Sequence, residues 1–163
     1  MMTSTTTVRG ITGLLRSFKD FLKISDLKPG DQVVYYGCVG TCTPFVELLA
    51  ITVRGMHLEQ VFVPLLDEAK AKKLHEVPDV GMQVSSEPSV LKPKVIIFMG
   101  GLAMPFMPVT GEQVRDRIAQ HGDVTVIGVC FMSMFEKAGW VGMVPFDLLI
   151  DGLLETVTVT RFT

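Results

Sequence analysis

The sequence predicts a single α/β domain, a three-layer Rossmann-like sandwich with a mostly parallel, doubly wound sheet of about five to six strands. Three observations predict this fold. The chain has 163 residues, 48% of them apolar and 20% charged, which is enough for one sizeable core. Helix and strand periodicities alternate along it. Segments 95–99 and 124–129 are uncharged and rich in β-branched residues, as in strands buried on both faces of a parallel sheet.

No repeat or linker divides the chain, so we expect one domain over 1–163, with the threonine-rich residues 1–9 disordered. The first half is predicted to hold, in order, helix 11–22, strand 32–36, helix 43–54, strand 60–63 and a short charged helix 67–76. Pro29 and Gly30 end the first helix. Thr43 is expected to cap the second helix, and Pro44 sits where a missing N–H is tolerated.

The second half is predicted to hold strand 80–85, strand 95–99, helix 110–121, strand 124–129, helix 133–138, an ambiguous segment 144–150 and a last, edge strand 156–161. Thr110 and Gln113 have the spacing of a capping box, which predicts where the third long helix begins. Asp151 and Gly152 form an Asp-Gly pair, which favours a turn before the last strand.

Ligands of doubly wound sheets bind beyond the carboxyl ends of the strands, so the segments of interest are 37–43, 100–108 and 130–135. The first is a glycine-containing turn before a helix, where free N–H groups and the helix dipole favour a phosphate or carboxylate. The residues expected to contact such a ligand are Gly37, Gly40, Thr41, Thr43, Gly100 and Gly101. An ordinary tight connection explains the same turn equally well.

Three cysteines, Cys38, Cys42 and Cys130, are expected to converge on this edge of the sheet. Cys42 precedes a helix, which predicts a lowered pKa and thiolate character. Three thiolates would suit a zinc ion or an iron–sulfur cluster. Because cysteine is among the most commonly buried residues, packing in the core is the default interpretation, and no metal is favoured.

No catalytic residue is identified. The three histidines, His57, His75 and His121, are expected at the surface and away from the cysteines, so none would serve a nucleophile. The acidic candidates share no diagnostic spacing and are Glu47, Asp67, Glu136, Asp147 and Asp151. The charged residues of 67–76 are expected to form a solvated helix face.

The loops at the expected ligand edge are unusually apolar. They hold Met99, Met104, Met107, Met132, Met134, Met143, Phe106, Phe131, Phe135 and Trp140. Core packing under a long loop is the commonest explanation. The alternatives are a lid over a flat ligand and a contact with a second copy, which predicts a homo-oligomer.

Charge and hydropathy exclude several partners. The formal net charge of −2 comes with no basic cluster, which argues against nucleic acid. No stretch of about 20 uninterrupted apolar residues is present, so we expect no membrane span. Without a secretory signal, and with an odd number of cysteines, the protein is expected to be cytoplasmic.

Two resemblances to known families add expectations. Residues 27–38, Leu-Lys-Pro-Gly-Asp-Gln-Val-Val-Tyr-Tyr-Gly-Cys, resemble the first motif of class I S-adenosylmethionine-dependent methyltransferases, which implies S-adenosylmethionine or another nucleotide as cofactor. Tyr35 and Pro64 stand where those enzymes usually carry acidic residues.

The blocks 33–44, 96–105, 126–140 and 146–147 resemble an uncharacterised family of small archaeal proteins found in methanogens. This second resemblance implies an intracellular, anaerobic setting and carries no activity. The leading hypothesis is therefore a cytoplasmic protein that binds a small anionic or nucleotide-type molecule. The alternatives are a methyltransferase-like enzyme, a non-catalytic homodimeric interaction module and a three-cysteine metal site.

Overall fold

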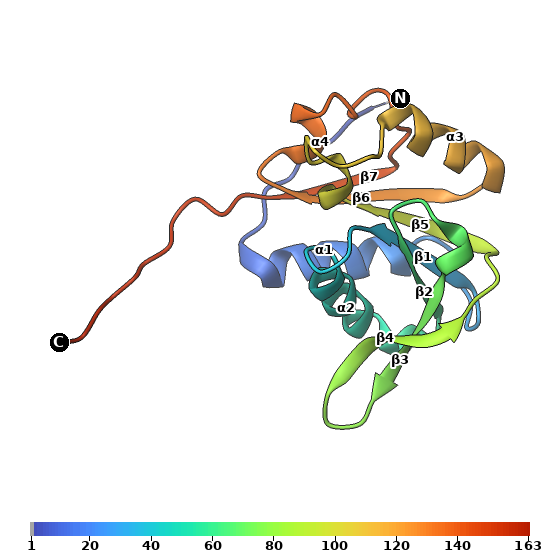
Figure 1. The fold of residues 1–163 in the computed structure, drawn as a ribbon, viewed down its shortest axis with the longest axis horizontal. Coiled ribbons are helices and arrows are strands. Elements are labelled where there is room, and N and C mark those ends of the chain that lie inside the picture. The colour runs from blue at the N-terminus through green and yellow to red at the C-terminus, as the bar shows by residue number, and fades with distance from the viewer. Residues whose placement is uncertain (1) are drawn as a thin grey trace.

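A computed structural model describes residues 2–163 and shows a seven-stranded sheet between two layers of helices (Figure 1). The strands are β1 (Gln32–Gly37), β2 (Glu59–Pro64), β3 (Lys72–Val77), β4 (Gly81–Pro88), β5 (Pro93–Met99), β6 (Thr125–Phe131) and β7 (Leu148–Gly152). The α-helices are α1 (Gly10–Lys23), α2 (Thr43–Thr52), α3 (Gly111–His121) and α4 (Met134–Lys137). Short 3₁₀ turns are η1 (Arg54–Met56), η2 (Glu68–Lys70) and η3 (Gly100–Ala103).

The strand order is β4-β3-β2-β1-β5-β6-β7. The five strands from β2 to β7 in this order are parallel, whereas β3 and β4 form an antiparallel hairpin beside β2. The chain moves from β1 to β2 in one direction and then crosses back to β5, so the winding reverses between β1 and β5. The predicted Rossmann-like α/β fold is confirmed, with seven strands in place of five or six.

Each face of the sheet has its own core, because successive side chains of a strand point to opposite faces. Tyr35 packs in the core that α1 and α2 cover, together with Phe18 and Leu22. Tyr36 packs in the core that α3 and α4 cover, together with Phe98, on which its ring stacks at 5.0 Å. All six residues of β1 are buried, which is typical of a central strand covered on both sides. Burying each of these large side chains contributes about 1.5–3 kcal/mol.

The predicted charged helix 67–76 is wrong. Only Glu68–Lys70 forms a single 3₁₀ turn, and Lys72–Val77 is strand β3. Leu74 of this strand is buried against the α2 side, while its neighbours His75 and Glu76 are exposed. The strand is stabilised by pairing with β2 and β4, a non-local interaction that overrides the helical charge pattern.

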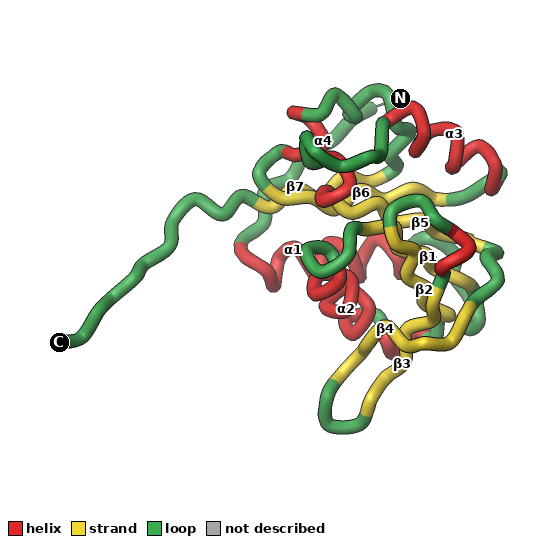
Figure 2. The backbone as a smooth tube through the Cα atoms, in the orientation of Figure 1, coloured by secondary structure: helices red, strands yellow, loops and turns green. Residues whose placement is uncertain are grey.

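The end of the chain also differs from the prediction. Asp151 and Gly152 are the last residues of β7 and pair with Cys130 and Phe131 of β6, so they form no turn. The predicted strand 156–161 is extended but pairs with no other segment among the described residues, and 153–163 runs away from the body (Figure 2). Of the ambiguous segment 144–150, the last three residues join β7.

Candidate functional site

The three predicted loops leave β1, β5 and β6 at the carboxyl edge of the sheet, and these strands are neighbours. Cysteines and glycines from them pack against one another there. A Cβ atom on Gly101 would lie 2.4 Å from the Cys42 Sγ and 2.5 Å from the Cys38 Sγ. The convergence of the cysteines on this edge is therefore confirmed, and Gly101 is the residue that leaves room for two of them.

Gly37 and Gly100, which are both buried, have the same kind of neighbour. A Cβ on Gly37 would lie 2.7 Å from Cys42 Cβ, and one on Gly100 would lie 2.4 Å from Cys130 Cβ. The space beside these glycines is thus filled by side chains of the chain itself. Their packing with the cysteines explains why glycine stands at each position.

The turn between β1 and α2 is the exposed part of the predicted loop. Gly40 has a φ of +83°, which favours glycine, and a Cβ there would meet no atom within 4 Å. Thr41 is exposed beside it. The prediction that Thr43 caps α2 is wrong: Cys42 is the N-cap residue, and the Thr43 hydroxyl accepts a hydrogen bond from the Gly40 N–H at 3.3 Å. The helix N-terminus consequently has no side-chain cap.

All three cysteines are buried free thiols. The Sγ atoms of Cys38 and Cys42 lie 3.1 Å apart. Burial, reinforced by the neighbouring Cys38 thiol, raises the pKa of Cys42 to about 12, and burial raises the pKa of Cys130 to about 11. The predicted thiolate at Cys42 is therefore wrong, because removal of the thiol from water outweighs the helix N-terminus.

The geometry gives the three-thiol metal hypothesis no support. Cys130 donates to the carboxylate of Asp151 at 3.5 Å, whereas Cys38 and Cys42 contact each other. Within residues 2–163, no group of three or more His, Cys, Asp or Glu side chains is placed to hold a metal ion.

Asp151 orders the turn that follows β6. Its carboxylate accepts hydrogen bonds from the Ser133 N–H and from the Ser133 hydroxyl, both at 3.0 Å. Ser133 has a left-handed backbone with φ +57°, as does Met132 before it. The two bonds compensate for this strained turn, so Asp151 has a structural role that the Asp-Gly pattern did not indicate.

A cavity of about 450 Å³ opens at the carboxyl edge on the α3 side. It lies between the segment that leaves β2 and one face of α3, from Gln113 to Gln120. Its lining residues are Leu65, Leu66, Asp67, Pro108, Val109, Gln113, Asp116, Arg117 and Gln120. One wall is apolar, and the α3 wall carries amides and charges at helical spacing. This volume lies within the range of about 300–1,000 Å³ that small-molecule sites occupy.

A half-buried polar cluster adjoins this cavity and is centred on Glu68. One carboxylate oxygen accepts from the Tyr36 hydroxyl and from His121 Nε2, both at 2.7 Å, and the other contacts Arg117 at 3.2 Å. Burial alone would raise the pKa of Glu68. The hydrogen bonds from His121 and Tyr36 outweigh this effect and hold the pKa below its usual value. Burial and the bond to Glu68 raise the pKa of Tyr36, so the phenol remains a donor.

This cluster corrects the expectation for His121. Its side chain is only 14% exposed and is fixed by Glu68, so it is not a surface residue. Sequence reasoning missed the cluster because Glu68 and Arg117 lie in different charged segments, each of which resembles a solvated face. No spacing rule connects a residue after β2 with the last turns of α3.

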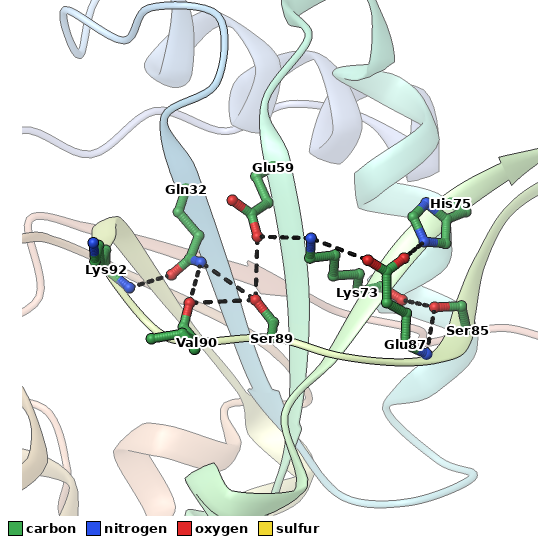
Figure 3. A network of polar contacts seen from close by, with 9 residues as sticks. All are labelled: Gln32, Glu59, Lys73, His75, Ser85, Glu87, Ser89, Val90 and Lys92. Atoms are coloured by element: carbon green, nitrogen blue, oxygen red, sulfur yellow. Dashed lines mark hydrogen bonds and ion pairs between the residues drawn. The ribbon is translucent and has the colours of Figure 1, made fainter.

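A second cavity, of about 570 Å³, lies at the opposite, amino edge of the sheet. Figure 3 shows the polar network beside it, in which Lys73 pairs with Glu59 at 3.8 Å and Glu87 at 3.2 Å. Gln32 bonds to the backbone of Val90 and Lys92 in the connection between β4 and β5. These groups pair with one another through hydrogen bonds and ion pairs. They fix the β3–β4 hairpin and the connection that leads from it to β5.

Other acidic candidates also serve the fold. Glu47 accepts from the Val84 N–H at 3.1 Å and so fixes β4 to α2. Asp147 accepts from the Val126 N–H at 2.8 Å at the start of β6. Glu136 is exposed, and Asp67 is the one of the five that lines the carboxyl-edge cavity.

Most of the apolar loop side chains belong to the core. Met99, Phe135 and Trp140 are buried, and Phe135 stacks on Trp140 at 5.2 Å. Phe106 and Met132 are the large exposed members, at 80% and 42%. Core packing therefore accounts for most of this set.

The fold and the cavity define a Rossmann-like α/β protein with a small-molecule-sized hollow at its carboxyl edge. A family model described as "Uncharacterized protein conserved in archaea (DUF2124)" matches residues 9–155. The chain belongs to this family, as the second resemblance predicted.

Relatives cover nearly the whole chain. It is 38% identical over 146 residues to an uncharacterized protein of Methanocaldococcus jannaschii. The matched region covers 90% of this chain and 87% of the relative. It is 33% identical over 151 residues to an uncharacterized protein of Methanothermobacter thermautotrophicus, with 90% and 92% covered. The crystal structure of a protein of unknown function from the latter organism is similar, with a TM-score of 0.84, 28% identity and 99% of both chains covered. Across residues 2–163, no helix combines the length and apolarity needed to cross a membrane.

Proposed function

We propose that the protein binds a small nucleotide-type molecule at the carboxyl edge of its parallel strands, with the nucleoside part in the 450 Å³ cavity. The observation that carries this proposal is the position and lining of that cavity. It lies at the edge where doubly wound sheets bind ligands, beside the strands at which the winding reverses. Leu65 lines the cavity and connects it to the end of β1, because its N–H donates to the carbonyl of Gly37 at 2.8 Å.

The chemistry of the lining favours a nucleoside over a free anion. The negative charges of Asp67 and Asp116 would repel a phosphate in this cavity. Their carboxylates are good hydrogen-bond acceptors for sugar hydroxyls. Asp67 follows β2, and an acidic residue after the second strand accepts from ribose in many nucleotide-binding α/β proteins. Gln120 supplies an amide for a base edge, and Gln113 supplies only its NH₂ group, because its side-chain oxygen accepts from the Thr110 N–H. The leucines on the opposite wall supply an apolar face.

The anionic part of such a ligand would lie at the exposed turn of Gly40 and Thr41, before the uncapped N-terminus of α2. The positive end of the α2 dipole favours negative charge at this place. In this arrangement Gly37, Gly100 and Gly101 act indirectly, because they allow the close packing that shapes the edge.

Isothermal titration calorimetry with the four ribonucleosides, their monophosphates, S-adenosylmethionine and inorganic phosphate tests the proposal. We expect at least one nucleoside to bind, its monophosphate to bind more tightly, and inorganic phosphate alone to bind more weakly than either. Asp67→Asn should weaken binding by about 10- to 100-fold, because a hydrogen bond to a charged acceptor contributes about 1.5–3 kcal/mol.

Asp123→Asn is the matched control, since this exposed aspartate lies outside the cavity. It should leave binding unchanged. No binding by any nucleoside or nucleotide, or equal binding by the Asp67 and Asp123 variants, would contradict the proposal. Methyl transfer from S-adenosylmethionine is a separate outcome that binding alone does not require.

We also propose that the protein acts in the cytoplasm. The support is the chemistry of its thiols: Cys38 and Cys42 lie 3.1 Å apart and are free. Reducing compartments keep such pairs as thiols. Fractionation of cells from the source organism, with detection by antibody, tests this location.

A further inference from the structure

The segment after β7, residues 153–163 (the tail), carries apolar side chains into solvent. The tail runs away from the body of the molecule, as Figures 1 and 2 show. Val157 is 70% exposed, Val159 87% and Phe162 91%. Leu153 and Leu154 are also exposed. Exposed apolar residues concentrated in one segment are typical of an interaction site.

The tail has the composition of a β-strand. Residues 156–160 alternate threonine and valine, both β-branched, and the tail contains no glycine, proline, asparagine or aspartate. Its backbone N–H and C=O groups form no ladder with any described strand. A strand-forming segment without a partner strand lacks the interaction that stabilises strands.

The end of β7 prevents the tail from folding back on its own sheet. Gly152 is held in the ladder with Phe131, and its carbonyl accepts from the Met132 N–H at 2.9 Å. The Leu154 N–H then contacts the Met132 Sδ at 3.4 Å, which keeps the chain on its outward course. A hairpin needs a turn at this place, and the following residues include none of the usual turn formers.

β7 also lacks a neighbour on one side. Within residues 2–163 it pairs with β6 alone, so the N–H and C=O groups along its outer edge have no strand partner there. An open edge of this kind is a template for strand addition. The charged residue of β7 is Asp151 and that of 156–163 is Arg161, so the two segments carry opposite charges.

We propose that the tail of one copy adds as a strand to the free edge of β7 in a second copy, and that the exchange is reciprocal. Each chain carries one donor segment and one acceptor edge, so two copies related by a two-fold axis satisfy both and close the assembly. This surface differs from the Met and Phe loops that the sequence suggested. The similarity to the solved Methanothermobacter structure covers 99% of this chain, a share that includes the tail.

Size-exclusion chromatography with light scattering tests the exchange on the full chain, on a chain ending at Glu155 and on Val159→Pro. Among the described residues 2–163, deletion of 156–163 removes no hydrogen bond and no buried side chain, so the shortened protein should fold, as circular dichroism would verify. We expect a dimer for the full chain and a monomer for the shortened one. Val159→Pro should weaken dimerisation by about tenfold or more, because proline removes a ladder donor. Thr163→Pro at the last residue is the control and should remain dimeric.

Hydrogen exchange supplies an independent readout. The amides of 156–161 should be protected in the full chain, and the protection should fall on dilution. A monomeric full chain with an unprotected tail would overturn the proposal. A dimer that persists in the chain ending at Glu155 would overturn it as well and would assign the interface to another surface, such as exposed Phe106 and Met132. Neither result depends on nucleotide binding.

Discussion

Gly101 shows how one residue without a side chain organises the carboxyl edge. Its Cα faces the thiols of Cys38 and Cys42, both buried, and a methyl group there would lie within 2.5 Å of each sulfur. Real Cβ atoms do not approach other atoms so closely, so the two thiols or the backbone of η3 would have to move.

We therefore predict that Gly101→Ala lowers the free energy of unfolding by about 1–3 kcal/mol, the usual cost of overpacking a core. Urea denaturation monitored by circular dichroism measures it. Gly55→Ala is the control, because a Cβ at Gly55 would meet no atom within 4 Å. The triple variant, which combines Gly101→Ala with Cys38→Ala and Cys42→Ala, should lose less free energy of unfolding than the three single variants lose in total. Equal stability of the two single glycine variants would contradict the packing argument.

The buried thiols predict a pH dependence of stability. The ordinary thiol pKa is 9.0, whereas Cys42 titrates near 12 and Cys130 near 11 in the folded protein. Below pH 9 both states hold their thiol protons. As pH rises above 9, the unfolded chain loses these protons before the folded chain does, so the free energy of unfolding falls.

Denaturation curves between pH 8 and about 11 measure this slope. Because lysines and tyrosines titrate in part of the same range, the comparison that matters is between the unmodified chain and Cys42→Ala. The variant should lose stability less steeply. Parallel slopes for the two proteins would show that Cys42 does not titrate differently on folding.

Among the elements, α3 is the one whose start can be recognised from local sequence. Thr110 accepts from the Gln113 N–H at 3.2 Å, and the Gln113 side chain accepts from the Thr110 N–H at 2.9 Å. This capping box confirms the predicted helix start, because both interactions lie within four consecutive residues.

Thr110→Ala should lower the free energy of unfolding by about 1 kcal/mol, the usual cost of losing an N-cap hydroxyl. Thr110→Ser keeps the hydroxyl and should retain most of the stability. Chemical denaturation of the three proteins provides the measurement. If the alanine and serine variants were equally stable, the cap would contribute nothing and the helix would be held by packing of Val114 and Ile118 alone.

β3 is the element that local sequence could not reveal. Its run of lysines and acids has the appearance of a solvated helix, yet it pairs with β2 on one side and β4 on the other. Its charges find partners across strands, as in the contact of Lys73 with Glu87 of β4 at 3.2 Å. A charge pattern alone does not distinguish pairing along a helix from pairing across strands.

At the scale of the whole molecule, the order of the strands places the features that matter at opposite edges. The carboxyl edge holds the packed thiols, the exposed turn at Gly40 and the cavity beside α3. The amino edge holds the network that fixes the hairpin connection. The outer strand β7 is the acceptor in the proposed exchange between copies, so the proposed nucleotide site and the proposed exchange lie on separate surfaces.

The sequence by itself determined the fold class, most of the helices and central strands, the three loops at one edge and the convergence of the cysteines there. These features follow from local periodicity, from turn and cap residues and from the general rule that parallel strands end at a common edge. Family membership was also evident from blocks of residues along the chain, and the family match over 9–155 confirms it.

Tertiary structure alone decided the rest. Whether 72–77 forms a strand, whether Asp151 ends a strand or turns the chain, and whether the Cys42 thiol ionises depend on neighbours far away in sequence. The cluster of Glu68 and His121 joins residues 53 positions apart, and its hydrogen bonds exist only once β2 and α3 are packed. Burial and pairing with distant residues determine these outcomes, and the local pattern of residues predicts neither of them.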